Sequence, residues 1–400
     1  MNATEGQISI SLFPGDKRER VAIRSSRPLH AARVLVGKTP QQAIEIIPLL
    51  FNICGTAQSR AALLAMKKEG DGEGMPAGSN DHRIEAARDM LVLVENAREH
   101  LMRLFTDWPR LFSLPADNNN LPYLSQLQST FRRALFDSSR AFTFDSALNS
   151  KAGEANNLID KLDDYLRDHV FACETVQWLQ IQDIAALHEW ATITNTIAAQ
   201  TIAIICERGW ASQGQSNCLP LPELDSEELC KQLDQPRSSD FIATPQWQGE
   251  CCETTSLSRQ LDNLLIQSLQ DEFQYTLITR WTARLVELAR IPGQLRALHA
   301  MLQTASPVGA HSPVHSLDTD RRVASIEAAR GRLIHRVQIE NGRIRHYQIL
   351  APTEWNFHPG GLAAQTLGSI ASRRHDDIDT LAHIMINVID PCVGYDLRVH

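Results

Sequence analysis

Apolar residues at helical spacing dominate the middle of the chain. Across residues 84–108 they alternate in steps of three and four, which places one apolar stripe along a long helix. Across residues 257–285, leucine or an aromatic residue recurs at every fourth position, and this spacing predicts a second long packed helix. Further segments with a helical pattern are 121–136, 155–172 and 173–208. We therefore expect residues 84–305 to form a bundle of four or five helices.

A short helix-turn-helix pattern precedes the bundle and places a cysteine at its turn. Thr39 can cap the first helix, with Pro40 at the first helical position and Gln42 where a capping box places its amide. The residues that follow are apolar and should be buried. Thr56 is a candidate cap for the second helix. Cys54 therefore falls between the two helices.

Strand signals gather at the two ends of the chain. Asn341-Gly342 separates two β-like runs and favours a tight hairpin turn, because both positions tolerate positive φ. The runs ISISL (8–12) and RVAIR (20–24) are the other strand candidates. We expect the two ends of the chain to share a small sheet.

Loops and helices together indicate the fold class. Segments rich in glycine, proline and polar residues are predicted to be loops: 70–82, 306–316 and most of 209–255, with one short helix near 223–234. The predicted class is α+β and mainly α, a long helix bundle with a small sheet from the two ends. We expect one domain over residues 1–400, in three parts: the strands and first cysteine turn (1–83), the bundle (84–305), and the hairpin and tail (306–400).

The composition is that of a large globular protein. With 43% apolar and 22% charged residues, the 400-residue chain can bury a sizeable core. Its 39 basic and 47 acidic residues give a net charge of -8, which argues against a nucleic-acid partner. No apolar run approaches the roughly 20 residues that span a bilayer, and the N-terminus lacks a secretion signal pattern. We expect a cytoplasmic protein without a membrane span.

Eight cysteines are scattered along the chain. They are Cys54, Cys173, Cys206, Cys218, Cys230, Cys251, Cys252 and Cys392. In a reducing compartment they are expected as thiols, and the vicinal pair at 251 and 252 is expected on a loop. The absence of any Cys-x-x-Cys pair removes the strongest sequence signal for zinc or an iron-sulfur cluster. A metal site would have to combine distant positions.

Three short segments, in their order along the chain, resemble the large subunit of nickel-iron hydrogenases. They are Asn52-Ile53-Cys54-Gly55, Ala351-Pro352-Thr353-Glu354-Trp355-Asn356 and Asp390-Pro391-Cys392. The family carries Arg-x-Cys-Gly-x-Cys near its start, Pro-Thr/Ser-Thr-Trp-Asn before its end, and a terminal Asp-Pro-Cys-x-x-Cys-x-x-His/Arg. Each motif is weak alone, so their order and spacing carry the resemblance. It covers roughly residues 27–110 and 327–400.

The resemblance implies a metal site with half of the family's sulfur ligands. In the family, the first cysteine of each pair binds nickel and the second bridges nickel and iron. Ala57 and Tyr395 stand at the two second positions here, so we do not expect this chain to hold the dinuclear centre. Other departures are Asn52 in place of arginine, Gly360 in place of a basic residue, and KRERVAIR where the family has Arg-Ile-Glu-Gly-His.

The end of the sequence narrows the resemblance to an accessory family. Arg398 matches the final His/Arg of the family motif, after which enzyme precursors continue into a tail that a protease removes. Only Val399 and His400 follow here, so we expect no cleavable tail. A large-subunit-like chain with half the sulfurs resembles the HupK/HoxV family of hydrogenase maturation proteins, which is implicated in assembling the iron-dicyanide-carbonyl unit, Fe(CN)2CO. This resemblance implies a non-catalytic scaffold whose partners are the hydrogenase large subunit and other maturation proteins.

Cys54 and Cys392 are the candidate metal ligands. Taken alone, Cys54 is better explained as a buried thiol that fills space after an apolar helix. With Cys392 inside a matching terminal motif, the ligand interpretation is favoured. Thiolates are soft donors that suit an iron carrying carbonyl and cyanide. A helix N-terminus would stabilise the Cys54 anion through the helix dipole and free amides. Two ligands in place of four would hold iron reversibly, as a carrier requires.

Four residues near the motifs are candidates for the surrounding pocket. Trp355 and Asn356 would shape the wall by packing and hydrogen bonding. His358 could be a third ligand or a proton carrier. Arg398 is included because it matches the family motif.

Other polar residues near the hairpin have simpler interpretations. His335 and His346 are predicted to lie on hairpin faces as ordinary polar residues. Glu327 and Arg330 resemble a pocket segment of the family, but a solvated helix end is nearly as good an explanation.

Two alternative functions stay open at this point. One is a metal-free pseudo-subunit that acts as a chaperone on the surface of its partners. The other is a catalytic large subunit, against which the missing bridging cysteines argue. Whether the thiols of Cys54 and Cys392 meet in the fold separates the carrier from the pseudo-subunit.

Overall fold

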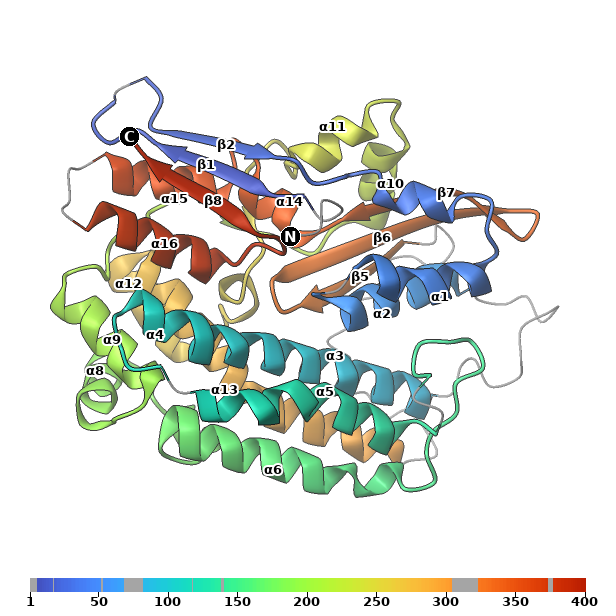
Figure 1. Ribbon diagram of the computed structural model, residues 1–400, viewed down its shortest axis with the longest axis horizontal. Helices are drawn as coiled ribbons and strands as arrows, with labels where there is room; N and C mark the ends of the chain where they lie inside the picture. Colours follow the sequence, from blue (N-terminus) through green and yellow to red (C-terminus); the bar gives the residue numbers. More distant parts are fainter. Residues whose placement is uncertain are drawn as a thin grey trace.

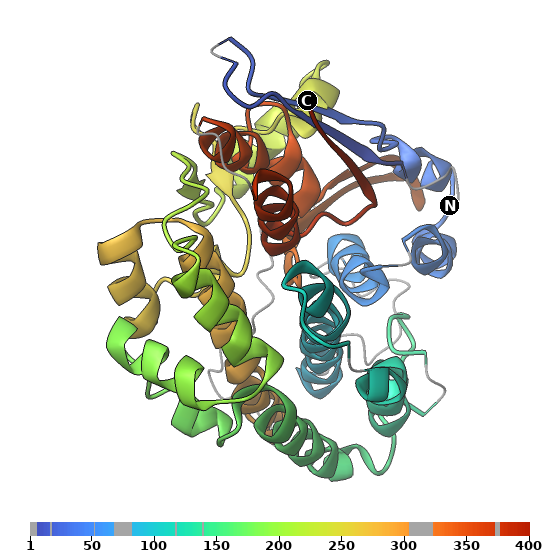
Figure 2. The same ribbon diagram turned by 60° about the vertical axis from the view of Figure 1, so that its left-hand side comes forward.

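The strands and the long helices occupy opposite halves of the molecule. The computed structural model describes residues 6–16, 18–51, 53–67, 82–116, 118–137, 140–303, 323–372 and 377–400. Two three-stranded sheets and the C-terminal helices lie above the helix bundle in both ribbon views (Figures 1 and 2). The predicted loop at 306–316 and the departure at Asn52 lie outside the described residues. The predicted loop at 70–82 does too, except His82, which begins α3.

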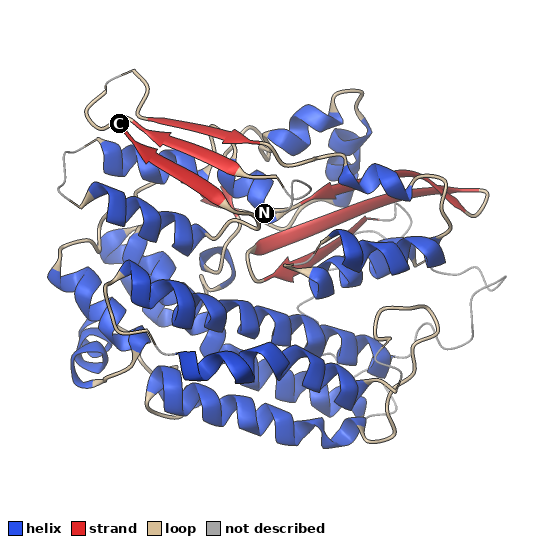
Figure 3. Ribbon diagram, viewed as in Figure 1, coloured by secondary structure: helices blue, strands red, loops and turns tan. Residues whose placement is uncertain are grey.

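The two ends of the chain share one sheet, as predicted. Its strands are β1 (Ile8–Leu12), β2 (Val21–Ser25) and β8 (Tyr395–Val399), in the order β2-β1-β8. β1 runs antiparallel to β2 and parallel to β8, with Ile8 opposite Tyr395. The apolar side chains of β1 alternate into the core, as one buried sheet face requires. The strand after Cys392 therefore anchors the terminal cysteine motif to the start of the chain (Figure 3).

The second sheet contains the predicted hairpin. β6 (Gly331–Glu340) and β7 (Arg343–Leu350) pair through Asn341 and Gly342, both at positive φ. The third strand, β5 (Val323–Ala328), was not predicted. On one face lie α1 (Pro40–Leu50) and α2 (Gly55–Met66), and on the other lie α10 (Ser226–Asp234) and α11 (Ser238–Ala243). The sheet is thus buried on both faces.

The predicted helix bundle is confirmed. α3 (His82–Met102) continues through a π-helical turn (Arg103–Asp107) into α4 (Trp108–Leu111). α5 (Leu121–Leu135) packs against α3, and α13 (Leu277–Leu302) packs against both α3 and α6 (Asn156–Leu166), which ends in the π-helical turn Arg167–Phe171. α3 lies against α13 and α5, so the predicted stripe of 84–108 is buried between neighbouring helices.

The prediction of one long helix over 257–285 is wrong. The segment contains a 3-10 turn (Leu257–Arg259), α12 (Leu264–Phe273) and the start of α13. Gln274 adopts a left-handed φ of 62°, and Thr276 is extended at the start of α13. Leucines in both helices face the same core, so the four-residue spacing continues across a break that periodicity cannot detect.

Residues 173–208 are also divided into shorter helices. They are α7 (Thr175–Trp178), α8 (Ile184–Ile193) and α9 (Ile197–Glu207). Asp183 accepts the backbone N–H of Ala186, and Thr196 accepts that of Ala199. These caps start new helices inside a continuous apolar pattern.

Segment 209–255 contains more structure than predicted. The helix expected near 223–234 is α10, but α11 and two short parallel strands, β3 (Leu219–Pro220) and β4 (Cys252–Glu253), accompany it. Pairing of these strands brings the Cα atoms of Cys218 and Cys251 to 4.8 Å, and the two residues form a disulfide. The expectation that these two cysteines are thiols is therefore wrong. Cys252 is buried within β4 and is not on a loop.

Three C-terminal helices complete the fold. They are α14 (Pro352–Phe357), α15 (Leu362–Ala371) and α16 (Ile378–Ile389). Short 3-10 turns at Ala31–Leu35, Asn118–Asn120 and Ala152–Ala155 link other elements. In the part of the chain that is described, no helix is both long and apolar enough to cross a membrane.

Candidate functional site

Cys54 lies at the N-terminal end of α2. The helix begins at Gly55, so Cys54 occupies the cap position that the sequence had given to Thr56. The backbone N–H groups of Thr56 and Ala57 donate to the two carboxylate oxygens of Glu95, at 2.8 and 2.9 Å. Glu95 comes from α3 and is buried. The predicted free amides at this helix end are therefore already occupied by a side-chain anion.

Cys392 follows a sharp turn at the end of α16. Asp390 adopts a left-handed φ of 67°, which ends the helix and redirects the chain. Its carboxylate lies 2.8 Å from Nη2 of Arg103 and 3.1 Å from Nε of Arg330. The backbone N–H of Cys392 donates to Oγ1 of Thr353 at 3.1 Å. Charge pairing and this hydrogen bond hold Cys392 against the start of α14.

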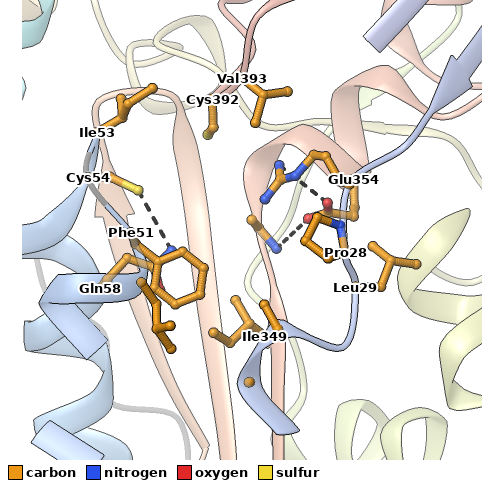
Figure 4. Close-up of a pocket in the computed structure, with 15 residues that line it drawn as sticks. Pro28, Leu29, Phe51, Ile53, Cys54, Gln58, Ile349, Glu354, Cys392 and Val393 are labelled. Atoms are coloured by element: carbon orange, nitrogen blue, oxygen red, sulfur yellow. Dashed lines mark hydrogen bonds and ion pairs between the residues drawn. The ribbon is translucent and has the colours of Figure 1, made fainter. Parts of the chain in front are cut away.

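The two cysteines meet in one cavity (Figure 4). Its volume is about 90 Å³, and both residues line it, as they line a smaller space behind it with Glu95, Glu99 and Arg330. Much of the remaining wall is apolar: Pro28, Leu29, Ala31, Ala32, Leu50, Phe51, Ile53, Ile349, Ala351 and Val393. The interaction of the two thiols with each other is the largest influence on both of their pKa values. The fold therefore brings together the two predicted ligands.

The two sulfurs differ in acidity, and the predicted stabilisation of the Cys54 anion is not found. The hydrogen bond from Cys54, together with the charges of Arg330 and Arg27, lowers the pKa of Cys392 to about 6 despite burial. The hydrogen bond to Cys392, burial and the nearby Glu95 raise the pKa of Cys54 well above its usual value. These directions favour the thiolate on Cys392 and the thiol on Cys54.

Two buried arginines face the thiol pair. Nη1 of Arg27 lies 3.3 Å from Oε1 of Glu354 on α14, and Nη2 of Arg330 donates to Glu99 at 3.1 Å. Both guanidinium groups interact with Cys392 and Cys54. Within the described residues, Nη1 of each arginine has no hydrogen-bond partner, although that of Arg27 is ion-paired with Glu354. N–H groups without a hydrogen bond thus lie in the two spaces that the sulfurs share.

A chain of hydrogen bonds runs away from Cys54 through the sheet. Nε2 of Gln58 donates to Sγ of Cys54 at 3.7 Å, and Oε1 of Gln58 lies 2.8 Å from Nε2 of His335. Nδ1 of His335 lies 2.8 Å from the hydroxyl of Tyr347. Because Oε1 of Gln58 can only accept, His335 carries its proton on Nε2 and accepts from Tyr347. Every donor in the chain therefore points toward the sulfur.

His335 differs from its prediction as an ordinary polar residue of the hairpin. It is fully buried between β6 and α2, and burial lowers its pKa to about 3. Alternation along β6 directs Leu333, His335 and Val337 to the face covered by α2. His346, on the outer hairpin strand, is exposed as predicted.

The other predicted pocket residues do not line the cavity. Trp355 is buried and packs edge-on against Phe241, with ring centroids 6.3 Å apart. Asn356 exchanges two hydrogen bonds with the backbone of Thr254, at 2.8 and 3.0 Å. His358 is buried and accepts the N–H of Gly360 at Nδ1.

Arg398 also lies away from the cavity. Its side chain on β8 is 71% exposed and pairs with Asp396 at 3.0 Å. Arg330, which had two nearly equal explanations from sequence, is buried and lines the smaller space beside the two cysteines. Glu327 instead pairs with Arg259 and Arg332.

Sequence reasoning missed Arg27, Gln58, Glu95 and Glu354. Glu354 was inside a quoted motif, where it replaces the second threonine of Pro-Thr/Ser-Thr-Trp-Asn, so its signal was present. Gln58 lies one turn after Cys54 on α2, which is a detectable spacing. Arg27 and Glu95 have no motif context, and only the tertiary fold brings them to the cysteines.

The donor set at the cavity is small. Ala57 is buried behind Cys54, and the hydroxyl of Tyr395 lies 2.9 Å from Nδ1 of His383, so neither supplies a sulfur or replaces one. Among the described residues, no group of three or more His, Cys, Asp or Glu side chains is arranged to hold a metal ion. Two thiols are what the chain offers to a metal at this site.

Comparisons with known proteins agree with the resemblance seen in the motifs. A family model for nickel-dependent hydrogenase matches residues 178–392. The chain is 27% identical to the hydrogenase expression/formation protein HupV of Azotobacter chroococcum mcd 1, over 98% of both proteins. It is 28% identical to the hydrogenase expression/formation protein HoxV of Cupriavidus necator, over 94% of this chain and 92% of that protein.

Solved structures carry the same fold. The Ni-Fe-Se hydrogenase of Desulfovibrio vulgaris Hildenborough in the reduced state matches with a TM-score of 0.62 at 16% identity, over 94% of each chain. The predicted hydrogenase-like architecture is thereby confirmed, and so is the resemblance to hydrogenase expression/formation proteins.

Proposed function

This chain belongs to the nickel-dependent hydrogenase family, and we propose that it is a non-catalytic accessory protein of hydrogenase formation. In this proposal, Cys54 and Cys392 hold an Fe(CN)2CO unit as cargo on its way to a hydrogenase large subunit. The names of its relatives support the accessory role. That the cargo is Fe(CN)2CO is a more specific claim than the accessory role.

One observation carries the proposal. The thiols of Cys54 and Cys392 meet in one cavity, whereas Ala57 and Tyr395 stand where the family motif has its two bridging cysteines. A site with two sulfurs lacks the ligands for a nickel-iron pair. It retains enough for a single iron that already carries other ligands.

The size and chemistry of the cavity fit such a cargo. Roughly 10–15 Å³ of this kind of space holds one water-sized group, so about 90 Å³ accommodates several diatomic ligands. Cys392 supplies a thiolate near neutral pH, and thiolate is a soft donor for iron. The apolar wall of the cavity suits carbonyl, and the unused N–H of Arg330 in the smaller space beside the same cysteines suits the nitrogen of cyanide.

The small donor set also suits release. A site that held its iron with four sulfurs would retain it, and two sulfurs leave the iron open to ligands from a receiving protein. The Cys54 thiol, with its raised pKa, is the more easily protonated of the two and so the better leaving ligand. In this proposal, the partners of the protein are the maturation proteins that supply the Fe(CN)2CO unit and the hydrogenase large subunit that receives it.

Infrared spectroscopy tests the proposal. The chain is purified from cells that also produce the hydrogenase maturation proteins, and the carbonyl and cyanide stretching region is recorded. We expect one carbonyl band and cyanide bands, lost in Cys54→Ser and in Cys392→Ser. Bands that are absent from the native chain, in a preparation that still binds the large subunit, would favour the metal-free chaperone. Hydrogen uptake by the isolated chain would favour a catalytic subunit.

A further inference from the structure

The ion pair of Arg27 and Glu354 lies in the wall of the cavity that Cys54 and Cys392 also line. Arg27 follows β2 and Glu354 lies on α14, so the pair joins two distant parts of the chain. Figure 4 shows Glu354 on the wall that faces Cys54, with Cys392 between them. The side chains of Arg27 and Glu354 are 15% and 7% exposed.

Glu354 fixes the position of Arg27. One of its oxygens accepts the backbone N–H of Ala351 at 3.0 Å, and the other faces the guanidinium at 3.3 Å. The carboxylate is thus held by the turn that begins α14 and holds Arg27 in turn. Glu354 also departs from the threonine of the motif Pro-Thr/Ser-Thr-Trp-Asn, so this carboxylate is a feature of the present chain.

The guanidinium of Arg27 acts on the sulfurs. It lines the same cavity as the two cysteines and interacts by charge with both, while its Nη1, which is ion-paired with Glu354, has no hydrogen-bond partner in the described part of the chain. Arg330 adds a second guanidinium in the smaller space that the two cysteines also line. A metal bound by the two sulfurs would therefore lie close to two fixed positive charges.

Such a site discriminates by charge. A bare divalent cation would be repelled by both guanidinium groups and would find two protein ligands where Zn²⁺ takes four. An iron that already carries two cyanides is anionic once two thiolates bind it, and its cyanide nitrogens can accept the free N–H of Arg27. The positive charge that repels a bare divalent cation attracts the anionic iron-cyanide fragment.

We infer that Arg27, positioned by Glu354, is a specificity-determining residue that excludes bare divalent metal ions from the Cys54–Cys392 site and favours an anionic, pre-assembled iron-cyanide fragment. This inference rests on the proposed function for its cargo. Its exclusion of free metal ions can be measured without any cargo.

Zinc titration of the apo chain tests the exclusion. Zn²⁺ affinity is measured by competition with a chromophoric chelator for the native chain, Arg27→Gln, Arg27→Lys and Arg24→Gln. Arg24 is an exposed arginine on β2 and is the matched control. Each protein is compared with its Cys54→Ser/Cys392→Ser form, so that binding by other cysteines is subtracted.

We expect Arg27→Gln to bind Zn²⁺ at the cysteine pair roughly tenfold or more tightly than the native chain, because a nearby positive charge is removed. Arg27→Lys and Arg24→Gln should stay close to the native value. Glu354→Gln keeps the guanidinium and removes its counter-charge, so it should bind Zn²⁺ more weakly than the native chain. This variant replaces Arg27→Gln as the test if Arg27→Gln does not fold. Equal affinity in Arg27→Gln and the native chain would overturn the inference, as would a gain that survives loss of both cysteines.

Infrared spectra of the chain loaded with Fe(CN)2CO test the cargo half of the inference, that Arg27 favours an iron-cyanide fragment. Arg27→Gln should shift the cyanide bands more than the carbonyl band, because the lost hydrogen bond ends on cyanide nitrogen. Cyanide bands that are unchanged in Arg27→Gln would overturn this half while the proposed function stands. A native chain without any bands would overturn the proposed function and the cargo half together, and the zinc result would still decide the role of Arg27.

Discussion

Gln58 connects Cys54 to a buried histidine that lies far away in the sequence. Its side-chain amide donates to Sγ of Cys54 at 3.7 Å and accepts from His335 at 2.8 Å. The i, i+4 spacing on α2 places the amide beside the sulfur, and the alternation of β6 places the imidazole beneath it. A helix and a strand from opposite ends of the chain thus jointly orient one candidate ligand.

Loss of this link should destabilise the protein. Gln58→Leu leaves the buried Nε2 of His335 without an acceptor, at a cost of about 1–3 kcal/mol in the free energy of unfolding. Gln126→Leu, at an exposed position of α5, is the control and should change little. Thermal denaturation measures both. Equal melting temperatures for the two variants would contradict the buried chain of hydrogen bonds.

The same link can be separated from packing by a double-mutant cycle. Adding His335→Leu to Gln58→Leu removes both partners, so the second change should cost less than it does in the native chain. The expected coupling is roughly 0.5–3 kcal/mol, the range for residues in direct contact. Additive effects would indicate that the two side chains are independent.

The two cysteines should differ in reactivity. Because the pKa of Cys392 is lowered to about 6 and that of Cys54 is raised, alkylation of the apo protein by iodoacetamide near pH 7 should modify Cys392 first. The pH profile for Cys392 should have its midpoint near 6, and Cys54→Ala should move it upward by removing the donor. Mass spectrometry of peptides from timed samples measures each site.

Cys173 provides a comparison for this experiment. Burial raises its pKa, so its modification should begin only at alkaline pH. A Cys392 profile that coincides with that of Cys173 would contradict the assignment of the thiolate.

A buried ion cluster on α3 should make stability depend on pH. Glu85 pairs with Arg60, Lys67 and Arg88, and these charges outweigh burial and hold its pKa at about 2, below the usual 4.5. Since the folded pKa is depressed, the stabilisation is present above about pH 4.5 and is lost as the pH falls toward 2. The shift corresponds to about 3 kcal/mol.

Glu85→Gln should therefore be less stable than the native chain at pH 7 and approach it as the pH falls through this window. Glu45→Gln is a suitable control, because Glu45 is 58% exposed and its contact with Arg140 is 3.9 Å long. Denaturant titrations at several pH values compare the three proteins. A difference at pH 2 as large as that at pH 7 would mean that Glu85 acts through something other than its charge.

Asp390 should be the most sensitive carboxylate near the site. Although burial opposes it, Arg103, Arg330 and Arg284 hold its pKa well below the usual range, so the carboxylate is charged and balances three guanidinium groups. Asp390→Asn leaves those three guanidinium groups without their counter-charge and should lower the free energy of unfolding by about 3–5 kcal/mol. Asp396→Asn removes an exposed pair with Arg398 and should cost about 0–1 kcal/mol.

Thermal denaturation again compares the two asparagine variants. An Asp390→Asn protein as stable as Asp396→Asn would show that the arginines are balanced elsewhere. Loss of Asp390 should also release the turn before Cys392, so the alkylation profile of Cys392 reports on the same change.

The sequence predicted what is local or carried by a motif. The capping box at Thr39 forms as expected, since Gln42 and Thr39 exchange their two hydrogen bonds. The hairpin turn at Asn341-Gly342 and the sheet shared by the chain ends are confirmed as well. Cys54 and Cys392 were paired because both belong to motifs of one family.

What sequence could not supply depends on contacts between distant segments. The break at Gln274 lies within an unbroken leucine pattern, because both helices face one core. The disulfide of Cys218 with Cys251 requires the short parallel pairing of β3 and β4. Glu95 occupies the amides of α2 that were expected to stabilise the Cys54 anion, and its place there follows only from the packing of α3.

X-ray absorption at the iron edge tests the central claim most directly. The sample is the native chain purified from cells that produce the maturation proteins, with Cys54→Ser and Cys392→Ser beside it. We predict two sulfur neighbours and several short bonds to carbon in the native protein, and loss of iron or of one sulfur in each variant. Iron without sulfur neighbours, or iron whose environment is the same in all three proteins, would contradict the account.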